Sequence, residues 1–248
     1  MRGGRFHQRA RAEAVLKGFS NAARLAPRRD LSNVTPVTRG RFITFEGGEG
    51  VGKSTQVRLL ADRLRDRGEV VVTREPGGSP GAEAIRALLV SGPVERWSPI
   101  SESLLVYAAR RDHIERVIAP ALARGAWVIC DRFYDSSTAY QGVAGGAPAS
   151  LLRALEAEVV GDLIPDLTLI LDLPAEVGLA RASERGLGEG RFEAKGAAFH
   201  ERLRAAFLEI ATAEPARCRV IDADADVDTV SERIGAALDQ RWGASDHG

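Results

Sequence analysis

A lysine inside a glycine run marks the first segment that could do chemistry. Residues 45–55 read FEGGEGVGKST, and the pattern G-x-x-x-x-G-K-S runs from Gly47 to Ser54. The 248-residue chain has only three lysines and relies on arginine for most of its positive charge. A lysine ammonium is a compact point charge that suits phosphate oxygens, whereas arginine is a planar fork. The segment therefore predicts phosphate binding by Lys53, rather than a glycine turn with an exposed lysine.

The residues on either side supply the strand and the helix that a P-loop needs. RFITF, residues 41–45, predicts a short buried strand, and residues 55–68 carry apolar side chains at helical spacing. Glycines let the loop turn successive N–H groups toward phosphate oxygens, and the helix N-terminus adds partial positive charge. We expect Ser54 to offer its hydroxyl to Mg²⁺. The predicted phosphate-binding residues are Gly47, Gly48, Glu49, Gly50, Val51, Gly52, Lys53, Ser54 and Thr55.

An arginine ends the next predicted strand. Arg74 follows the apolar residues of 69–74, and the turn Pro-Gly-Gly comes two residues later in TREPGG. A rigid proline followed by permissive glycines sets the direction of the chain at this point. We predict that Arg74 clamps a second phosphate with two hydrogen bonds. The alternative is an ion pair with Glu75 or Asp131.

An aspartate–arginine pair ends a third predicted strand, residues 127–132. Asp131 follows the apolar run of VICDRFYDSSTAY, which is the usual position for a carboxylate that holds Mg²⁺ through water. Arg132 adjoins it, and the alternative is a solvated Asp–Arg pair. By itself, the polar group that follows is more typical of a helix start than of a base-reading surface. It comprises Ser136, Ser137, Tyr140 and Gln141.

A fourth segment whose residues could take part in chemistry is RASERGLGEGRFEAKG, residues 181–196. Its three closely spaced glycines, Gly186, Gly188 and Gly190, predict a mobile lid. Arg185 and Arg191 could fold over a transferring phosphoryl group. A solvated charged loop is the alternative.

Strand and helix patterns alternate from residue 41 onward. Continuous apolar strands alternating with amphipathic helices predict an α/β fold, in which a parallel sheet of about five strands is covered on both faces. Ligands bind beyond the carboxyl ends of such strands, where the polar residues above lie. The predicted strands are 41–45, 69–74, 127–132, 167–173 and 217–223. The predicted helices are 54–67, 80–90, 100–124, 147–160, 175–185, 194–213 and 226–241.

The composition indicates one domain, residues 39–248, with a sizeable core, because 44% of the residues are hydrophobic. No apolar run approaches the length of a membrane span. Cys130 and Cys218 lie far apart inside apolar runs, which predicts reduced core residues and a cytoplasmic protein. No asparagine follows residue 33, so the Asn-Lys-x-Asp loop of GTPases is missing.

Positive charge is concentrated at the N-terminus. Residues 1–40 hold nine basic and two acidic residues, whereas the rest of the chain holds 25 basic and 32 acidic residues. An acidic body with local arginines suits a small anionic substrate better than a nucleic acid. For residues 1–38 three interpretations stay open: a disordered basic arm, an organelle-targeting segment, or upstream sequence that is not translated. We favour the third, because a GTG start codon would read as Val37.

Taken together, these motifs resemble the bacterial thymidylate kinases, P-loop nucleoside monophosphate kinases that phosphorylate dTMP to dTDP with ATP. The matching segments span about residues 40 to 240. They are FITFEGGEGVGKSTQ, TREPGG, YAARRDH, DRFYDSSTAYQG, PDLTLILDLPAEVGLARA and GRFE. The resemblance implies the three-layer P-loop NTPase fold, Mg²⁺ and ATP as cofactors, dTMP as substrate, and a homodimer. It implies neither a nucleic-acid partner nor a membrane.

The resemblance also implies a role for each matching residue. Lys53, Ser54 and the loop amides would hold the ATP phosphates, and Asp131 would help to hold Mg²⁺. The arginines at the two strand ends, Arg74 and Arg132, would bind the dTMP phosphate. The lid arginines, Arg185 and Arg191, would supply the charge that some family members place within the P-loop, where this chain has Gly50 and Val51.

The remaining implied roles concern the nucleoside. Arg110 would hydrogen-bond the thymine, with Ser137 and Gln141 also touching the base. Tyr140 would pack on the deoxyribose, and Glu49 would lie by its 3′-hydroxyl.

Two positions depart from the family pattern. Val106 stands where a phenylalanine usually stacks on thymine, and Tyr107 or Phe133 would have to replace that ring. Gly190 replaces the aspartate of the usual Asp-Arg-Phe-Glu lid motif. Three alternatives to a dTMP kinase stay open: a kinase for another pyrimidine monophosphate such as dUMP, a non-catalytic ATP switch, and nucleic-acid binding through the basic arm.

Overall fold

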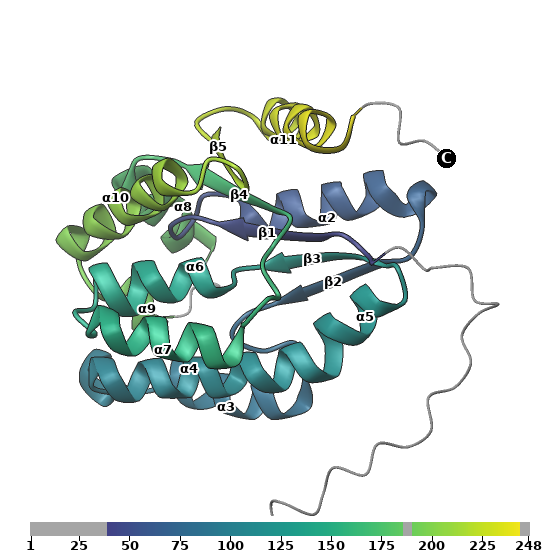
Figure 1. The fold of residues 1–248 in the computed structure, drawn as a ribbon. Coiled ribbons are helices and arrows are strands. Elements are labelled where there is room, and N and C mark those ends of the chain that lie inside the picture. The colour runs from purple at the N-terminus through teal and green to yellow at the C-terminus, as the bar shows by residue number, and fades with distance from the viewer. Residues whose placement is uncertain (1–38, 186–189, 244–248) are drawn as a thin grey trace, which may run out of the picture. The chain divides into compact units, whose positions relative to one another are not determined.

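Five parallel strands form a single sheet, which confirms the predicted α/β class (Figure 1). The spatial order is β2-β3-β1-β4-β5, and each neighbouring pair is parallel. Every predicted strand was correct to within one residue at each end. The strands are β1 (Phe42–Glu46), β2 (Val70–Arg74), β3 (Trp127–Asp131), β4 (Leu167–Asp172) and β5 (Cys218–Asp222).

The computed structural model describes residues 39–185 and 190–243, without the side chains of residues 185, 190 and 193. The three interpretations of residues 1–38 therefore lie outside the described residues. The same is true of Gly186 and Gly188 in the predicted lid.

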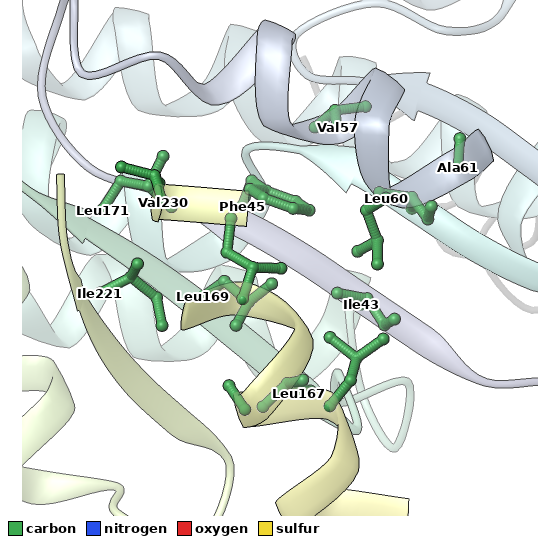
Figure 2. Packing of buried hydrophobic residues seen from close by; sticks show 14 of the residues in the cluster. Ile43, Phe45, Val57, Leu60, Ala61, Leu167, Leu169, Leu171, Ile221 and Val230 are labelled. Atoms are coloured by element: carbon green, nitrogen blue, oxygen red, sulfur yellow. The ribbon is translucent and has the colours of Figure 1, made fainter. Parts of the chain in front are cut away.

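One face of the sheet is covered by α2 (Lys53–Leu64) and α11 (Val227–Trp242). Alternate side chains of β1, Ile43 and Phe45, point to this face and pack with Leu60 of α2 and Val230 of α11 (Figure 2). The strand is buried along its whole length. Its continuous apolar run is typical of a strand that is covered on both sides.

The opposite face is covered by α4, α5, α7 and α10, and α3 packs against α4 (Figure 1). Two apolar clusters lie beneath them, one around Phe42 and Phe133 and the other around Ile170 and Phe207. The arrangement is the predicted three-layer architecture. The helices are α3 (Pro80–Val90), α4 (Pro99–His113), α5 (Ala119–Ala123), α7 (Ala149–Val159) and α10 (Ala197–Ala213).

Two helices predicted as continuous are interrupted. The predicted helix 100–124 contains a π-helical turn at Ile114–Ile118 between α4 and α5, next to Pro120, which has no N–H for the regular hydrogen bond. The predicted helix 194–213 begins only at α10, because Gly196 has a φ of 78°. A short α9 (Gly190–Glu193) precedes it, and α8 (Ala175–Arg185) agrees with the prediction.

Several short elements were not predicted. The most important are α6 (Tyr134–Ser137) and the π-helical turn Thr138–Val143 that continues it. They carry the polar group that follows β3. Two 3₁₀ turns, Arg65–Arg67 and Val94–Arg96, complete the described elements.

The site is positioned by the strand order. β1 lies between β3 and β4, so the chain leaves β1 at the point where the order of the strands reverses. Such switch points form the ligand crevice of open α/β sheets. Cys130 and Cys218 are buried and form no disulfide, as predicted. Among the described helices, none is long and apolar enough to cross a bilayer.

Candidate active site

The P-loop connects β1 to α2 and depends on glycine at three positions, the first of which is Gly47 with a φ of 127°. Gly50 and Gly52 have φ angles of 68° and 94°, which side chains rarely adopt. A Cβ atom at Gly50 would overlap the carbonyl oxygen of Gly178 in α8. No side chain caps the first turn of α2 within the described chain. Its amide groups can therefore serve an anion such as phosphate.

Lys53 lies against its own loop. Its Nζ donates hydrogen bonds to the carbonyl oxygens of Gly47 at 3.2 Å and Gly48 at 2.6 Å. Burial, followed by the charge of Arg132, lowers the pKa of Lys53 to about 8. A phosphate at the loop would add negative charge beside this buried ammonium and favour its charged form.

The two predicted magnesium ligands contact each other. Ser54 Oγ donates to Asp131 Oδ2 at 3.0 Å, so a hydroxyl and a carboxylate meet at the start of α2. Mg²⁺ is usually held by one or two such oxygens together with waters and substrate phosphates. The described residues contain no group of three or more His, Cys, Asp or Glu side chains that could hold a metal by themselves. The pair therefore fits a magnesium ion that arrives with a nucleotide.

Arg132 joins the P-loop to the next strand end. Its Nη1 donates to the Gly47 carbonyl oxygen at 2.9 Å, and its Nη2 donates to Glu49 Oε1 at 3.1 Å. The guanidinium lies 4.8 Å from the centre of the Tyr140 ring. Arg132 also has a φ of 72°, which is uncommon for a residue other than glycine and is found most often at functional sites.

Glu49 is ionised within this cluster. Burial opposes its charge, but Arg132, Lys53 and the hydrogen bond from Tyr140 lower the pKa of Glu49 to about 2. The Tyr140 hydroxyl donates to Glu49 Oε1 at 2.6 Å. A carboxylate acceptor thus lies between the P-loop and the adjoining pocket.

That pocket, called the acceptor pocket below, brings together most of the predicted substrate residues. They are Glu49, Arg110, Arg132, Ser137, Tyr140 and Gln141. The other lining residues are Glu75, Pro76, Val106, Phe133, Ser136 and Phe192. These residues come from the P-loop, the turn after β2, α4, the segment that follows β3, and α9, so the pocket exists only in the folded chain.

Two buried polar atoms of the residues that line this pocket are available to a ligand. Arg110 Nη1 and Ser137 Oγ have no hydrogen-bond partner among the described residues. The rest of the Arg110 guanidinium is held, because Nε donates to Glu75 Oε2 at 2.7 Å and Nη2 donates to the Phe133 carbonyl oxygen at 3.0 Å. Unpaired buried polar groups are rare and costly, so both atoms suit the polar edge of a bound base.

Arg74 lies at the edge of the site. Its Cα is in register with that of Asp131 on β3, but its half-exposed guanidinium pairs with Glu83 of α3 at 3.1 Å. The alternative partners that the sequence suggested, Glu75 and Asp131, do not take this role. Arg86 is a nearby cation that sequence reasoning missed, and it donates to the Pro76 carbonyl oxygen at 2.6 Å.

Arg191, one of the two lid arginines, is held away from the P-loop by its contacts. Arg191 is buried, pairs with Glu102 at 2.6 Å, and donates to the carbonyl oxygens of Leu89, Pro93 and Val94. These contacts tie Arg191 to the α3–α4 region, and its predicted role at a transferring phosphoryl group stays a prediction. Arg185 ends α8, and its side chain lies outside the described residues.

Besides Tyr140, two aromatic rings line the acceptor pocket, which Val106 also lines. They are Phe133, which the sequence suggested, and Phe192, which it missed although GRFE contains it. Tyr107, the other suggestion, lies under Arg110, whose guanidinium carbon is 4.6 Å from its ring centre. Gln141 is oriented by Glu102, which accepts from its Nε2 at 2.9 Å.

Glu46 is a buried carboxyl group that sequence reasoning also missed. It accepts hydrogen bonds from Phe133 N at 2.8 Å and from Ser136 Oγ at 2.6 Å. Burial, followed by the charge of Asp135, raises the pKa of Glu46 to about 8. Glu46 thereby anchors α6 to the end of β1 and supports one wall of the pocket.

Comparisons with known proteins agree with this geometry. The family model that matches is thymidylate kinase, over residues 45–234. A thymidylate kinase of Caulobacter vibrioides is 68% identical over 208 residues, which cover 84% of this chain and 100% of that protein. One of Afipia carboxidovorans is 57% identical over 206 residues, covering 82% of this chain and 90% of the relative.

A solved structure adds the fold. The crystal structure of thymidylate kinase from Ehrlichia chaffeensis superposes with a TM-score of 0.66 at 36% identity, and the match covers 81% of this chain and 98% of that one. This match confirms the P-loop NTPase fold. The family model, the curated relatives and the solved structure all point to one family, and the chain belongs to the thymidylate kinase family.

Proposed function

We propose that this protein transfers the γ-phosphoryl group of Mg·ATP to the 5′-phosphate of dTMP, giving ADP and dTDP. The observation that carries the proposal is the junction at Arg132, which contacts the P-loop at Gly47 and lines the acceptor pocket. One guanidinium can therefore face both reacting phosphates. Membership in the thymidylate kinase family supports dTMP as the acceptor.

The chemistry needs positioning and charge rather than a strong base. A phosphate oxygen of the acceptor is already a nucleophile, so holding it in line with the γ-phosphorus and neutralising the developing charge are the main tasks. Lys53 and the amides of Gly47–Thr55 hold the donor phosphates, and Arg74 and Arg132 hold the acceptor phosphate. When bound by Ser54 and Asp131, Mg²⁺ adds positive charge on the phosphate oxygens.

The nucleoside is recognised by the pocket walls. Arg110, Ser137 and Gln141 contact the base, Tyr140 packs on the deoxyribose, and Glu49 accepts from its 3′-hydroxyl. Arg185 and Arg191 of the lid add charge at the phosphates, which for Arg191 requires the exchange of its present contacts with the α3–α4 region. A homodimer is part of the proposal. So is a reducing, cytoplasmic setting, which is supported by the two cysteines that form no disulfide.

The test is ADP release by the full chain with Mg·ATP and, separately, dTMP, dUMP, dCMP or dGMP. We expect strong stimulation by dTMP and weak stimulation by the purine and the aminopyrimidine. Equal stimulation by dUMP would instead support a kinase that accepts several pyrimidine monophosphates, the alternative that Val106 suggests. ATP binding without stimulation by any acceptor would instead support a nucleotide switch.

A further inference from the structure

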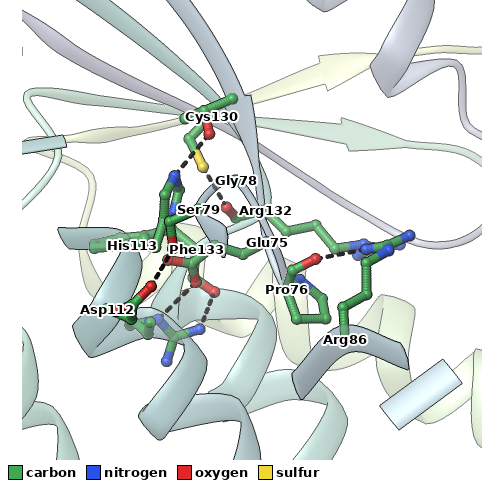
Figure 3. A network of polar contacts seen from close by, with 12 residues as sticks. Glu75, Pro76, Gly78, Ser79, Arg86, Asp112, His113, Cys130, Arg132 and Phe133 are labelled. Atoms are coloured by element: carbon green, nitrogen blue, oxygen red, sulfur yellow. Dashed lines mark hydrogen bonds and ion pairs between the residues drawn. The ribbon is translucent and has the colours of Figure 1, made fainter. Parts of the chain in front are cut away.

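A chain of hydrogen bonds leads away from the acceptor pocket to His113, which is not among the residues that line the pocket (Figure 3). It runs from Arg110 through Glu75 to His113 and ends at Thr73 on β2. His113 is completely buried. Neither the P-loop chemistry nor the resemblance gives these last two residues a role.

The carboxylate of Glu75 is the centre of the chain. Its Oε2 accepts from Arg110 Nε at 2.7 Å, and its Oε1 accepts from His113 Nδ1 at 3.1 Å. Arg110 and His113 are three residues apart on α4, so both side chains reach the same carboxylate. A carboxylate can only accept, so Nδ1 carries a hydrogen atom. His113 therefore fixes the oxygen of Glu75 that Arg110 leaves unused.

Thr73 fixes the histidine in turn. Its Oγ1 lies 2.7 Å from His113 Nε2. Gly78 has a φ of 86°, and a Cβ atom there would lie 2.5 Å from both of these atoms. The absence of a side chain at Gly78 therefore lets Thr73 of β2 and His113 of α4 approach each other beside this turn.

The end of the chain at the pocket is Arg110. Because a guanidinium is planar, holding Nε and Nη2 also sets the direction of Nη1, the nitrogen that has no partner in the described part of the chain. We propose that His113, itself held by Thr73, is a positioning residue for base recognition: it holds Glu75, and Glu75 holds Arg110 with Nη1 available to the base.

The inference rests on the proposed function, and two substitutions of His113 separate the parts of its role. Asparagine places an amide donor at the position of Nδ1, so His113→Asn keeps the contact with Glu75. Glutamine places its amide near Nε2, so His113→Gln loses that contact. Asp112→Asn is the matched control, because Asp112 anchors the same turn through Ser79 at 2.6 Å without touching Glu75 or Arg110.

The experiment measures the dTMP dissociation constant by calorimetry, the KM values for dTMP and ATP, and Tm in the full chain. We expect His113→Gln to weaken dTMP binding and raise its KM about tenfold, with the KM for ATP unchanged and less discrimination against dCMP. His113→Asn should stay within about threefold of the parent protein. The control Asp112→Asn should lower Tm without changing dTMP binding.

Equal dTMP affinity in His113→Gln and the parent protein would overturn the inference. So would equal losses of affinity in His113→Gln, His113→Asn and the control. If His113→Gln does not fold, Thr73→Val tests the same chain, with dTMP binding expected to weaken about threefold and no change overturning the inference. Absence of dTMP binding to the parent protein would overturn both this inference and the proposed function, whereas binding without turnover would overturn the function alone.

Discussion

The donor side and the acceptor side of this site are built in different ways. The P-loop is nine consecutive residues, Gly47–Thr55, and most of its predicted phosphate contacts are backbone amides. The acceptor pocket is assembled from five separate segments, and its ligand-facing groups are side chains. In this pocket the position of the Arg110 guanidinium depends on a hydrogen bond to Glu75, which is 35 residues away in the sequence.

The difference shows where each side is vulnerable. Backbone amides are positioned by local geometry, so the donor side depends on few side chains and chiefly on Lys53. The acceptor side depends on buried ion pairs, in which the loss of one partner leaves the other unpaired. We therefore expect donor-side substitutions to affect turnover and acceptor-side substitutions to affect affinity and selectivity.

The largest effect is expected from Lys53→Ala. It removes the one side-chain cation of the donor loop, and we expect kcat to fall by at least about 100-fold, because charge stabilisation in the transition state is lost. Tm should not fall, since the substitution removes a buried charge whose pKa is already lowered. Lys53→Arg keeps the charge and should also lose most turnover. Near-normal turnover in Lys53→Ala would refute the P-loop assignment.

The second prediction concerns Glu49, which stands between the two sides. Its folded pKa of about 2 is below the ordinary glutamate value of 4.5, so its charge stabilises the fold above pH 4.5. That stability is lost as the pH falls from 4.5 toward 2. The shift corresponds to about 3 kcal/mol.

Urea unfolding of the parent protein and Glu49→Gln would check this. Glu49→Gln should be less stable at pH 7, and the gap should narrow steadily below pH 4.5. A gap that does not depend on pH would mean that the ion pair with Arg132 is not the source of the stability.

The third prediction concerns a substitution that should affect the acceptor side alone. Arg74→Ala should raise the KM for dTMP about tenfold while the KM for ATP changes little, because a charge-assisted phosphate contact is lost. Glu83→Gln is its counterpart, since it removes the charge that now pairs with Arg74. It should leave the KM for dTMP unchanged or lower it by no more than about fivefold. Steady-state kinetics with each substrate varied would decide, and equal effects of Arg74→Ala on both KM values would remove Arg74 from the acceptor site.

The smallest effect is expected from Val106→Phe, which sharpens the acceptor side. Val106 lines the pocket next to Phe133 and Phe192. A ring at this position would add a stacking face, and we expect dTMP to bind about threefold more tightly. Calorimetry with dTMP and dUMP would measure it. Weaker binding of both nucleotides would show that the existing rings already fill this space.

Much of the donor side was predictable because its information is local. G-x-x-x-x-G-K-S between a strand pattern and a helix pattern predicted the loop, and the structure brings the two predicted metal ligands, Ser54 and Asp131, to 3.0 Å. The five strands were also predictable, since short continuous apolar runs rich in β-branched residues are typical of buried parallel strands. The exclusion of a side chain at Gly50 was not, because the obstacle is Gly178 in a distant helix.

The acceptor side shows what only the tertiary structure decided. Motifs indicated Arg74, Arg110 and Arg191 as cations, but not which of them would be exposed, which would be buried, and which partners they would take. Arg74 pairs with Glu83, Arg110 with Glu75, and Arg191 with Glu102. These pairings follow from how α3, α4 and α9 pack, and packing depends on contacts between residues that are distant in the sequence.

By itself, then, the sequence determined the fold class, the phosphate loop and the family resemblance, because each depends on short-range patterns of residue type. The structure decided which polar atoms stay unpaired at the acceptor pocket, namely Arg110 Nη1 and Ser137 Oγ among the described residues. It also decided that His113 and Thr73 lie behind Arg110. Burial and hydrogen-bond partnership are properties of the packed chain, since a buried polar atom is satisfied or left free only by the neighbours that folding brings to it.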